Sequence, residues 1–297
     1  MSVHAWLTVE TAQSELHASL QRVYAGWRSL FRNPLGLAGL IVICLLVLVA
    51  AFAPMLATYP PYEQNLRAPL LPPGGEHLLG TDELGRDIWS RLVYGARITL
   101  MIVVLVSVIA APVGLFLGTV SGVMGGLVDI AIMRVTDLFL AFPSLILALA
   151  FVAALGPGLE NAIVAIALTA WPPIARLARA ETLTVRGSDY IAAVRLQGAS
   201  TWRLILRHVV PMCIPSVVVR VTLNMAAVIL TAAGLGFLGL GAQPPTAEWG
   251  AMVSTGRRYM LDSWWVVTMP GIAILTVSLA FNLFGDALRD ILDPRGE

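Results

Sequence analysis

Few residues in this chain have the types and spacing that chemistry requires. The four histidines are scattered, and no pair has the spacing of metal ligands. The two cysteines, Cys44 and Cys213, lie in or next to apolar runs, where we expect them to pack rather than to form a disulfide framework. All 19 basic residues are arginines, whereas a phosphate-binding P-loop needs a lysine. We therefore expect no metal, no bound cofactor and no ATP-hydrolysing site in this chain.

The composition indicates a membrane environment. Hydrophobic residues make up 58% of the 297 residues, charged residues only 12%, and the mean hydropathy is +0.81. Soluble domains carry about 25% charged residues, so a water-soluble fold would leave too much apolar surface exposed. The formal net charge of +1 gives no bulk attraction for nucleic acid. A lipid bilayer is the expected surrounding, and no nucleic acid is expected as a partner.

Six apolar stretches are long enough, or nearly so, to cross a hydrocarbon core of about 30 Å as helices. They are Leu37–Leu56, Ile98–Val120, Ile130–Leu155, Ala162–Ile174, Ile214–Leu240 and Val266–Phe284. The first exceeds the roughly 7–15 apolar residues of a cleaved signal peptide, so we interpret it as an uncleaved span. Backbone groups in lipid must be satisfied internally, which favours helices. The sequence predicts an all-α integral membrane protein with six transmembrane helices.

The distribution of arginines predicts the orientation in the membrane. With the N-terminus inside, the inner segments hold twelve arginines and the outer segments hold six. Positively charged residues are enriched on the cytoplasmic side. An even number of spans returns the chain to its starting side, so both termini are expected in the cytoplasm.

The longest inner segment between spans has the pattern of two helices joined by a tight turn. Ser188 is a good N-cap for a helix that covers Tyr190–Gln197. Gly198 then ends this helix, because glycine adopts the left-handed C-cap conformation at little cost. A second helix is predicted over Thr201–Val210, ending before Pro211. The residues alone leave two interpretations equally open, a docking site for a protein and an amphipathic connector that lies on anionic lipid.

Charged residues also cluster before the second span. Asp82 and Arg86, and likewise Asp87 and Arg91, have the i,i+4 spacing of helix pairs. Such pairs contribute only about 0.2–0.5 kcal/mol each on an exposed helix. The spacing favours a short interfacial helix over the outer mouth, with a role in receiving substrate as the alternative.

Further charges flank two other spans. Arg134 and Asp137 lie near the inner end of the third span, where we expect them to pair. Asp286 and Arg289 are expected to cap the inner end of the last span. We interpret all four as structural charges at the cytoplasmic end.

Four segments resemble one family of membrane proteins. They read YIAAVRLQGAS from Tyr190, HLLGTDELGRDIWSRLVYGAR from His77, GLGFLGLGAQPPTAEWGAM from Gly234 and FNLFGDALRDILDP from Phe281. Together they resemble the ABC importer permeases of the dipeptide, oligopeptide and nickel family, specifically the C-type subunit. The resemblance covers nearly the whole chain from Asn33 onward.

The first of these segments is similar to the EAA-type loop of that family, which contains the coupling helix that sits in a cleft of the ATPase subunit. Gly198 and Pro211 stand at the family spacing, and Ala193 is retained. The chain departs from the pattern at Ala192, where the family has glutamate, and at Val194. This departure puts a glutamate-mediated contact with the ATPase in doubt.

The resemblance implies a type I ABC importer permease fold and specific site residues. The expected ATPase-coupling residues are Tyr190, Ala192, Ala193, Arg195, Gly198, Ala199, Ser200, Arg203 and Pro211. The candidates for the external face or gate are Asp82, Arg86, Asp87, Gln243, Glu248 and Trp249.

It also implies partners and boundaries. The expected partners are a homologous permease subunit, two ABC ATPase subunits that use ATP and Mg, an extracytoplasmic solute-binding protein and a peptide-like substrate. The expected location is the bacterial cytoplasmic (inner) membrane. The predicted division is a cytoplasmic segment (1–33), a first span with its external loop (34–94), a core five-helix permease domain (95–290) with the coupling loop 176–210, and a cytoplasmic tail (291–297). The substrate stays open among peptides, opines, glutathione-like peptides and metal chelates.

Two other classes of protein compete with a permease subunit. An ion-coupled transporter or channel places acidic residues or histidine near the membrane midplane, but Arg220 is the charge nearest to that depth. An intramembrane enzyme needs a catalytic constellation, and no histidine lies within a predicted span. Both alternatives are therefore disfavoured.

Overall fold

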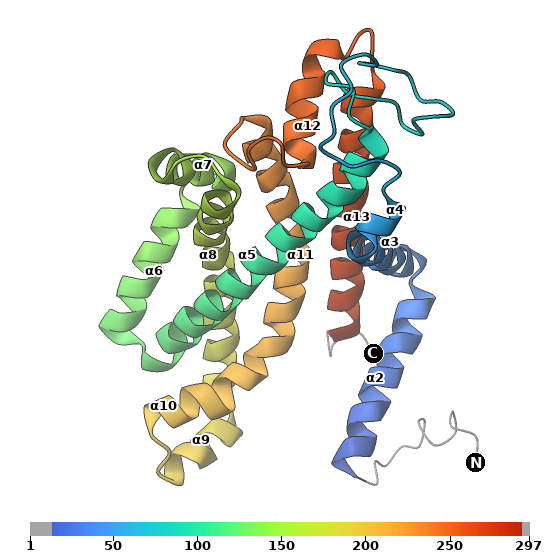
Figure 1. Ribbon diagram of the computed structural model, residues 1–297. Helices are drawn as coiled ribbons and strands as arrows, with labels where there is room; N and C mark the ends of the chain where they lie inside the picture. Colours follow the sequence, from blue (N-terminus) through green and yellow to red (C-terminus); the bar gives the residue numbers. More distant parts are fainter. Residues whose placement is uncertain (1–13, 293–297) are drawn as a thin grey trace, which may run out of the picture.

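The computed structural model describes residues 14–292, and in this range the chain forms helices and loops without a β-strand (Figure 1). Within the described range, three helices precede the first long loop, and several short helices connect the long ones. The helices are α2 (Glu15–Arg32), α3 (Pro34–Ala51), α4 (Ala53–Leu56), α5 (Ile88–Met124), α6 (Gly126–Leu140), α7 (Ser144–Leu155), α8 (Leu159–Arg186), α9 (Asp189–Leu196), α10 (Thr201–Leu204), the π-helical turn Ile205–Val209, α11 (Val210–Phe237), α12 (Trp249–Gly256), the 3₁₀ turn Arg257–Tyr259 and α13 (Trp265–Leu292).

The long apolar helices confirm the prediction of six membrane spans, with one modification. Five helical stretches are long and apolar enough to cross a membrane: α3, α5, α8, α13 and the continuous stretch Thr201–Phe237. The third predicted span is broken, because α6 and α7 meet at an angle of 93°. The break falls at Pro143, which lacks a backbone N–H and precedes the first residue of α7. The bent pair gives the sixth span.

Several spans extend beyond their apolar cores because polar residues cap them. The Asn33 side chain accepts a hydrogen bond from the backbone N–H of Gly36 at 3.0 Å, and Pro34 occupies the first turn of α3. Asp87 caps α5 in the same way by accepting from the N–H of Ser90 at 2.8 Å. The membrane helices therefore begin at capping residues that a count of apolar residues does not include.

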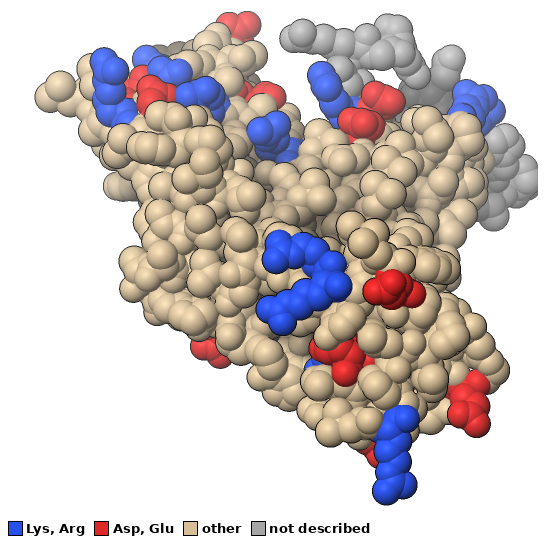
Figure 2. All heavy atoms as spheres, turned by 90° about the horizontal axis from the view of Figure 1, so that it is seen from above, with Lys and Arg blue, Asp and Glu red and all other residues tan. Residues whose placement is uncertain are grey.

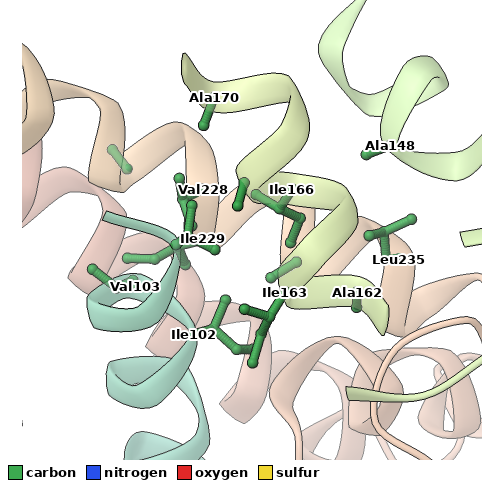
Figure 3. Close-up of a cluster of buried hydrophobic side chains, with 14 of the residues drawn as sticks. Ile102, Val103, Ala148, Ala162, Ile163, Ile166, Ala170, Val228, Ile229 and Leu235 are labelled. Carbon is green, nitrogen blue, oxygen red and sulfur yellow. The ribbon is translucent and has the colours of Figure 1, made fainter. Parts of the chain in front are cut away.

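The main core lies where α5, α8 and α11 cross (Figure 3). The labelled aliphatic side chains come from all three helices, with Ala148 of α7 at the edge. Fully or nearly fully buried members include Ile102, Val106, Ile166, Ile174 and Leu235. Because lipid is as apolar as these side chains, close packing rather than the hydrophobic effect holds such helices together.

A stripe of glycines brings α5 and α8 into close contact. Gly114, Gly118 and Gly122 recur at every fourth position of α5 and face α8. A Cβ atom at Gly114 would lie 2.7 Å from Ile174 Cβ, and one at Gly122 would lie 2.6 Å from the Thr182 methyl group. These spacings leave no room for a side chain, as in small-xxx-small packing of membrane helices.

The bundle has two ends that differ in structure (Figure 1). One end, which we call the α12 end, carries α12 and the long segment 57–87 between α4 and α5. The opposite end, which we call the α9 end, carries α9, α10 and the last residues of α13, with α2 on the same side. Seen from above, the surface is mostly uncharged, with scattered arginines and acidic residues (Figure 2).

Candidate docking site

The helix–turn–helix at the α9 end has the capping that its sequence indicates. The Ser188 hydroxyl accepts a hydrogen bond from the backbone N–H of Ile191 at 3.4 Å, which starts α9. Gly198 ends the turn with φ +78°, in the left-handed region that favours glycine. Ser200 then accepts from the N–H of Arg203 at 3.4 Å and starts α10. Local residue choice therefore defines this turn before any tertiary contact forms.

A separate apolar cluster fastens α9 to the bundle. Ile191 is fully buried and Val194 nearly so. Their neighbours come from the end of α5, from the last residue of α10 and from the chain after it: Val120, Val123, Leu204, Ile205, Val209 and Cys213. One face of α9 is thus anchored to helices that enter the membrane, so a force on α9 acts on those helices.

The opposite face of the turn is exposed. Leu196 leaves 90% of its surface accessible, and Tyr190 leaves 51%. A Cβ atom at Gly198 would meet nothing within 4 Å. The remaining predicted coupling residues are also exposed, except the half-buried Ala199: Ala192, Ala193, Arg195, Ser200, Arg203 and Pro211. A protein surface could therefore approach the backbone of this turn closely.

A hollow of ≈ 350 Å³ lies beside the turn. Its walls come from the C-terminal end of α5 and from the turn itself, and its lining residues are Val123, Met124, Arg195, Ala199, Thr201 and Leu204. It places an exposed guanidinium next to apolar side chains, a combination suited to receiving a protruding element of another protein.

Two aromatic contacts hold the second half of the turn in place. The Tyr190 hydroxyl and His208 Nδ1 are 2.7 Å apart, which connects α9 to the π-helical turn. Trp202 stacks on Phe116 of α5 with ring centroids 6.2 Å apart and an interplanar angle of 5°. Both contacts connect the exposed turn to structural elements that continue into the membrane.

The second helix does not end before Pro211, contrary to the prediction. After α10 the chain continues through the π-helical turn directly into α11. Pro211 lies in the first turn of α11, where its missing N–H costs little. The wider π turn before it accommodates the proline without a break in the helix.

The inner loop is also shorter than predicted, because α8 continues to Arg186. Arg176 and Arg179 therefore belong to α8, where they form ion pairs with α6. The Arg176–Asp137 distance is 2.6 Å, and Arg179 binds both carboxylate oxygens of Asp129 at 2.6 and 2.7 Å. The Ser121 hydroxyl also donates to Asp129.

The expected Arg134–Asp137 pair is therefore not formed. Asp137 is paired with Arg176 instead, because the neighbouring helix presents a guanidinium directly opposite the carboxylate. Spacing along α6 alone gives no signal for these pairs, because both arginines lie on another helix. The side chains of Arg134, Asp286 and Arg289 are exposed. Arg134 lies within α6, and Asp286 and Arg289 lie near the C-terminal end of α13.

At the α12 end, the predicted helix over Asp82–Arg91 is wrong. Residues 82–87 form a turn, and α5 begins only at Ile88. Gly85 has φ +70°, and aspartate side chains that bind nearby backbone N–H groups compete with helix formation. Asp82 accepts from the backbone N–H groups of Leu84 and Arg86, both at 2.9 Å.

One predicted ion pair of this segment exists and the other does not. Arg86 Nε lies 2.7 Å from Asp82, and both side chains are buried. Asp87 pairs with His77 at 2.9 Å rather than with Arg91. Arg91 lies 3.5 Å from Asp82, and its guanidinium donates to the carbonyl of Pro61 at 3.1 Å. These charges hold the segment 57–87 onto the first turns of α5.

The other gate candidates have structural contacts. Glu248 is 4% exposed and caps α12, accepting from the N–H groups of Gly250 and Ala251 at 2.8 and 2.7 Å. Burial raises the pKa of Glu248 to about 7, although these two N–H groups act in the opposite direction. The buried Trp249 donates its indole N–H to the carbonyl of Leu92 at 3.1 Å. Gln243 donates to backbone carbonyls of its own loop.

This fold is that of a membrane-spanning subunit of an ABC transporter. It is similar to a chain in inward-facing structures of the MetNI methionine ABC transporter, with a TM-score of 0.56 and 21% identity over 69% of this chain and 97% of that chain. Residues 110–296 match the family described as binding-protein-dependent transport system inner membrane component. Residues 23–73 match the N-terminal TM domain of oligopeptide transport permease C.

Curated relatives agree with the family match. The chain is 47% identical to the probable D,D-dipeptide transport system permease protein DdpC of Escherichia coli, over 89% of this chain and 88% of the relative. It is 48% identical to the di/tripeptide transport system permease protein DppC of Pseudomonas aeruginosa, over 91% of both chains. The chain therefore belongs to the family of binding-protein-dependent transport system inner membrane components. It is a multi-pass permease subunit of an ABC importer, as its sequence predicted.

Proposed function

We propose that this chain is the C-type permease subunit of an ATP-driven importer of di- or oligopeptides. It pairs with a homologous permease subunit, and two separate ATPase subunits supply the energy by using ATP and Mg. An extracytoplasmic binding protein delivers the peptide to the α12 end. The names of the relatives, which refer to dipeptides and di/tripeptides, support this substrate class.

The observation that carries the proposal is the exposed turn at the α9 end. Its outer face is free, with Leu196 almost fully accessible, while Ile191 and Val194 bind its inner face to α5 and to the start of α11. Such an element can receive a partner on one side and transmit its motion on the other. We assign α9 as the coupling helix and place the α9 end in the cytoplasm.

The orientation rests on two observations that agree. Twelve arginines fall on the proposed inner side and six on the outer side. The first described helix and the last residues of α13 both lie at the α9 end (Figure 1). A cytoplasmic α9 end therefore puts both ends of the described chain in the cytoplasm, where the ATPase subunits are.

The test is uptake of a labelled dipeptide into proteoliposomes that contain this chain, its permease partner and both ATPases, with the binding protein outside. Wild-type uptake should require ATP inside the vesicles. Gly198→Trp should abolish uptake while the protein stays in the membrane, because a bulky side chain at φ +78° both strains the turn and blocks the docking face.

The matched control is Gly75→Trp at the α12 end, which also has open space around its Cβ position. This variant should keep the ATPase subunits bound during purification. Full ATP-driven uptake by Gly198→Trp would refute the coupling role of the turn. Uptake by the purified chain alone without ATP would refute the importer and favour a self-contained transporter.

A further inference from the structure

A second cavity lies between α8, α11 and α13, away from the docking turn. It has a volume of ≈ 770 Å³ and is open to the surface. Its lining includes Met212 near the start of α11 and Leu292 at the end of α13, so the cavity extends toward the α9 end. Apolar side chains such as Leu177 and Leu223 form much of the wall. A volume of this size is typical of small-molecule sites, about 300–1,000 Å³.

Three charged side chains line this cavity, one from each helix. They are Glu181 of α8, Arg220 of α11 and Arg289 of α13. Within residues 14–292, none of the three has a side-chain hydrogen bond or an ion pair. In the α6–α8 region, Asp129 and Asp137 pair with Arg179 and Arg176, whereas Arg134, Glu160 and Arg186 form no ion pair within the described residues. Three charged side chains without a partner inside the described chain therefore face the same cavity.

The depth of Arg220 makes its lack of a partner informative. It lies ten residues after the first residue of α11, or about 15 Å along the helix axis. An ionisable group at membrane depth is costly unless it faces water or an opposite charge, and such groups mark substrate paths. The cavity is therefore a hydrated space that reaches into the membrane from the α9 end.

The arrangement of charges fits a ligand with both an anion and a cation. We propose that this cavity holds the free termini of a short peptide on its way to the cytoplasm. Arg220 and Arg289 bind the carboxylate, which the planar guanidinium group matches in a bidentate manner, and Glu181 binds the ammonium group. The apolar wall accepts side chains of different shapes. This inference rests on the proposed function and adds a site to it.

Another ligand shares this chemistry. The head group of phosphatidylethanolamine also combines an anion with an ammonium group, and a carboxylate of the permease partner could pair with the arginines. A peptide differs from both because each of its termini can be blocked separately. The experiment uses this difference.

The test measures binding of L-alanyl-L-alanine to the complete complex of permease pair and ATPases, in phosphatidylcholine nanodiscs without ATP and without binding protein. Titration by saturation-transfer NMR compares the free dipeptide with its C-terminal amide and its N-acetyl form. Wild type should bind the free dipeptide about tenfold or more tightly than either blocked form, since each loses one charge-assisted hydrogen-bonded contact.

The variants should act on one terminus each. Arg220→Gln should weaken the free dipeptide to the level of the amide and leave the amide unchanged. Glu181→Gln should weaken binding of the free dipeptide to the level of the N-acetyl form and leave binding of the N-acetyl form unchanged. Arg134→Gln, an exposed arginine in α6 outside the cavity, should leave all three affinities as in wild type.

Several results would overturn the site. They are equal binding of the three dipeptide forms to wild type, an equal loss of all three forms in Arg220→Gln, and displacement of the dipeptide by phosphatidylethanolamine at bilayer concentration. If Arg220→Gln fails to assemble with the partner, Arg289→Gln carries the same test. Failure of both variants to assemble would assign the cavity to the partner subunit.

An uptake measurement with wild-type complex from the same preparation separates the two proposals. Uptake without terminus-selective binding refutes the cavity site and leaves the proposed function intact.

Discussion

The α12 end holds most of its buried charges in ion pairs and hydrogen bonds within the chain, although Arg91 Nε and Glu83 Oε2 lack a hydrogen-bond partner, whereas the α9 end exposes much of its docking turn. Asp82 receives two backbone N–H groups and the Arg86 guanidinium, with Arg91 close by. In contrast, the turn at Gly198 contacts the bundle through one apolar face and two aromatic contacts, and its Leu196 is 90% exposed. The first region is held mainly by contacts within the chain, and the second exposes the surface on which we propose that an ATPase subunit docks.

This difference separates two ways of placing polar residues in a membrane protein. Buried ion pairs fix a loop in one conformation, and removing one partner leaves an uncompensated charge. Exposed residues on a capped turn cost the fold little and remain available for contact. Substitutions at the α12 end should therefore change stability, while those at the α9 end should change association. Four experiments test this contrast, ordered by their expected effect on stability.

The largest loss of stability is expected for Asp82→Asn. The substitution leaves Arg91 buried without its carboxylate neighbour and leaves Arg86 with Glu83 alone, and breaking a buried pair costs about 3–5 kcal/mol. The measurement is the thermal unfolding midpoint of the purified protein in detergent. The control at the other end is Asp189→Asn in the exposed first turn of α9, where a charge contributes about 0.3–1 kcal/mol. Equal shifts in the two variants would contradict the contrast.

The next effect is a pH dependence that depends on Glu248. Its pKa is raised from an ordinary 4.5 to about 7, so the folded state holds the proton more tightly than the unfolded state. Stability should be highest below pH 4.5 and should fall as the pH rises toward and past 7, by as much as roughly 3 kcal/mol. Unfolding midpoints across this pH range should decline in wild type. Glu248→Gln stays neutral at every pH, so this variant should lose the part of the decline that Glu248 causes. A pH profile of the unfolding midpoint that is the same in the variant and in wild type would contradict the role of Glu248.

A smaller but clear loss is expected for Gly250→Ala. The new Cβ would overlap the backbone of Ala233 in α11, and backbone cannot move aside as a flexible side chain does. Overpacking of this kind costs typically 1–3 kcal/mol. Gly271→Ala in α13 is the control, since nothing lies within 4 Å of its Cβ position. The two unfolding midpoints should differ, with Gly271→Ala at or above wild type.

The smallest effect on stability is expected for Leu196→Asp, because the side chain is 90% exposed. Its unfolding midpoint should stay within the range of ordinary surface substitutions, about 0.5 kcal/mol. Copurification of the ATPase subunits should nevertheless be lost. Leu261→Asp at the α12 end starts from the same exposure of 90% and should retain them. Loss of the ATPases in both variants would show that the effect is not specific to the α9 end.

The sequence was sufficient where local physics decides the outcome. Apolar length predicted the spans, and Ser188 and Gly198 predicted a capped helix and its end, because caps and left-handed turns depend on single residues. It was insufficient where partners distant in sequence decide. Helical spacing around Asp82 suggested a helix, but Gly85 and the backbone N–H groups nearby favoured a turn. Asp137 found its partner on another helix, which no spacing along α6 could indicate.

The 37-residue helical stretch from Thr201 to Phe237 has a mechanical consequence. At 1.5 Å per residue, this stretch is about 55 Å long along its axis and contains no loop. The docking turn lies at one tip, Arg220 projects from its middle, and Gly236 packs against Glu248 at the other tip. If the docking turn couples to an ATPase as we propose, a rotation of the turn would move both ends of this continuous helical stretch together. The π-helical turn Ile205–Val209 and Pro215 inside α11 are two places where this stretch departs from regular α-helix and can bend.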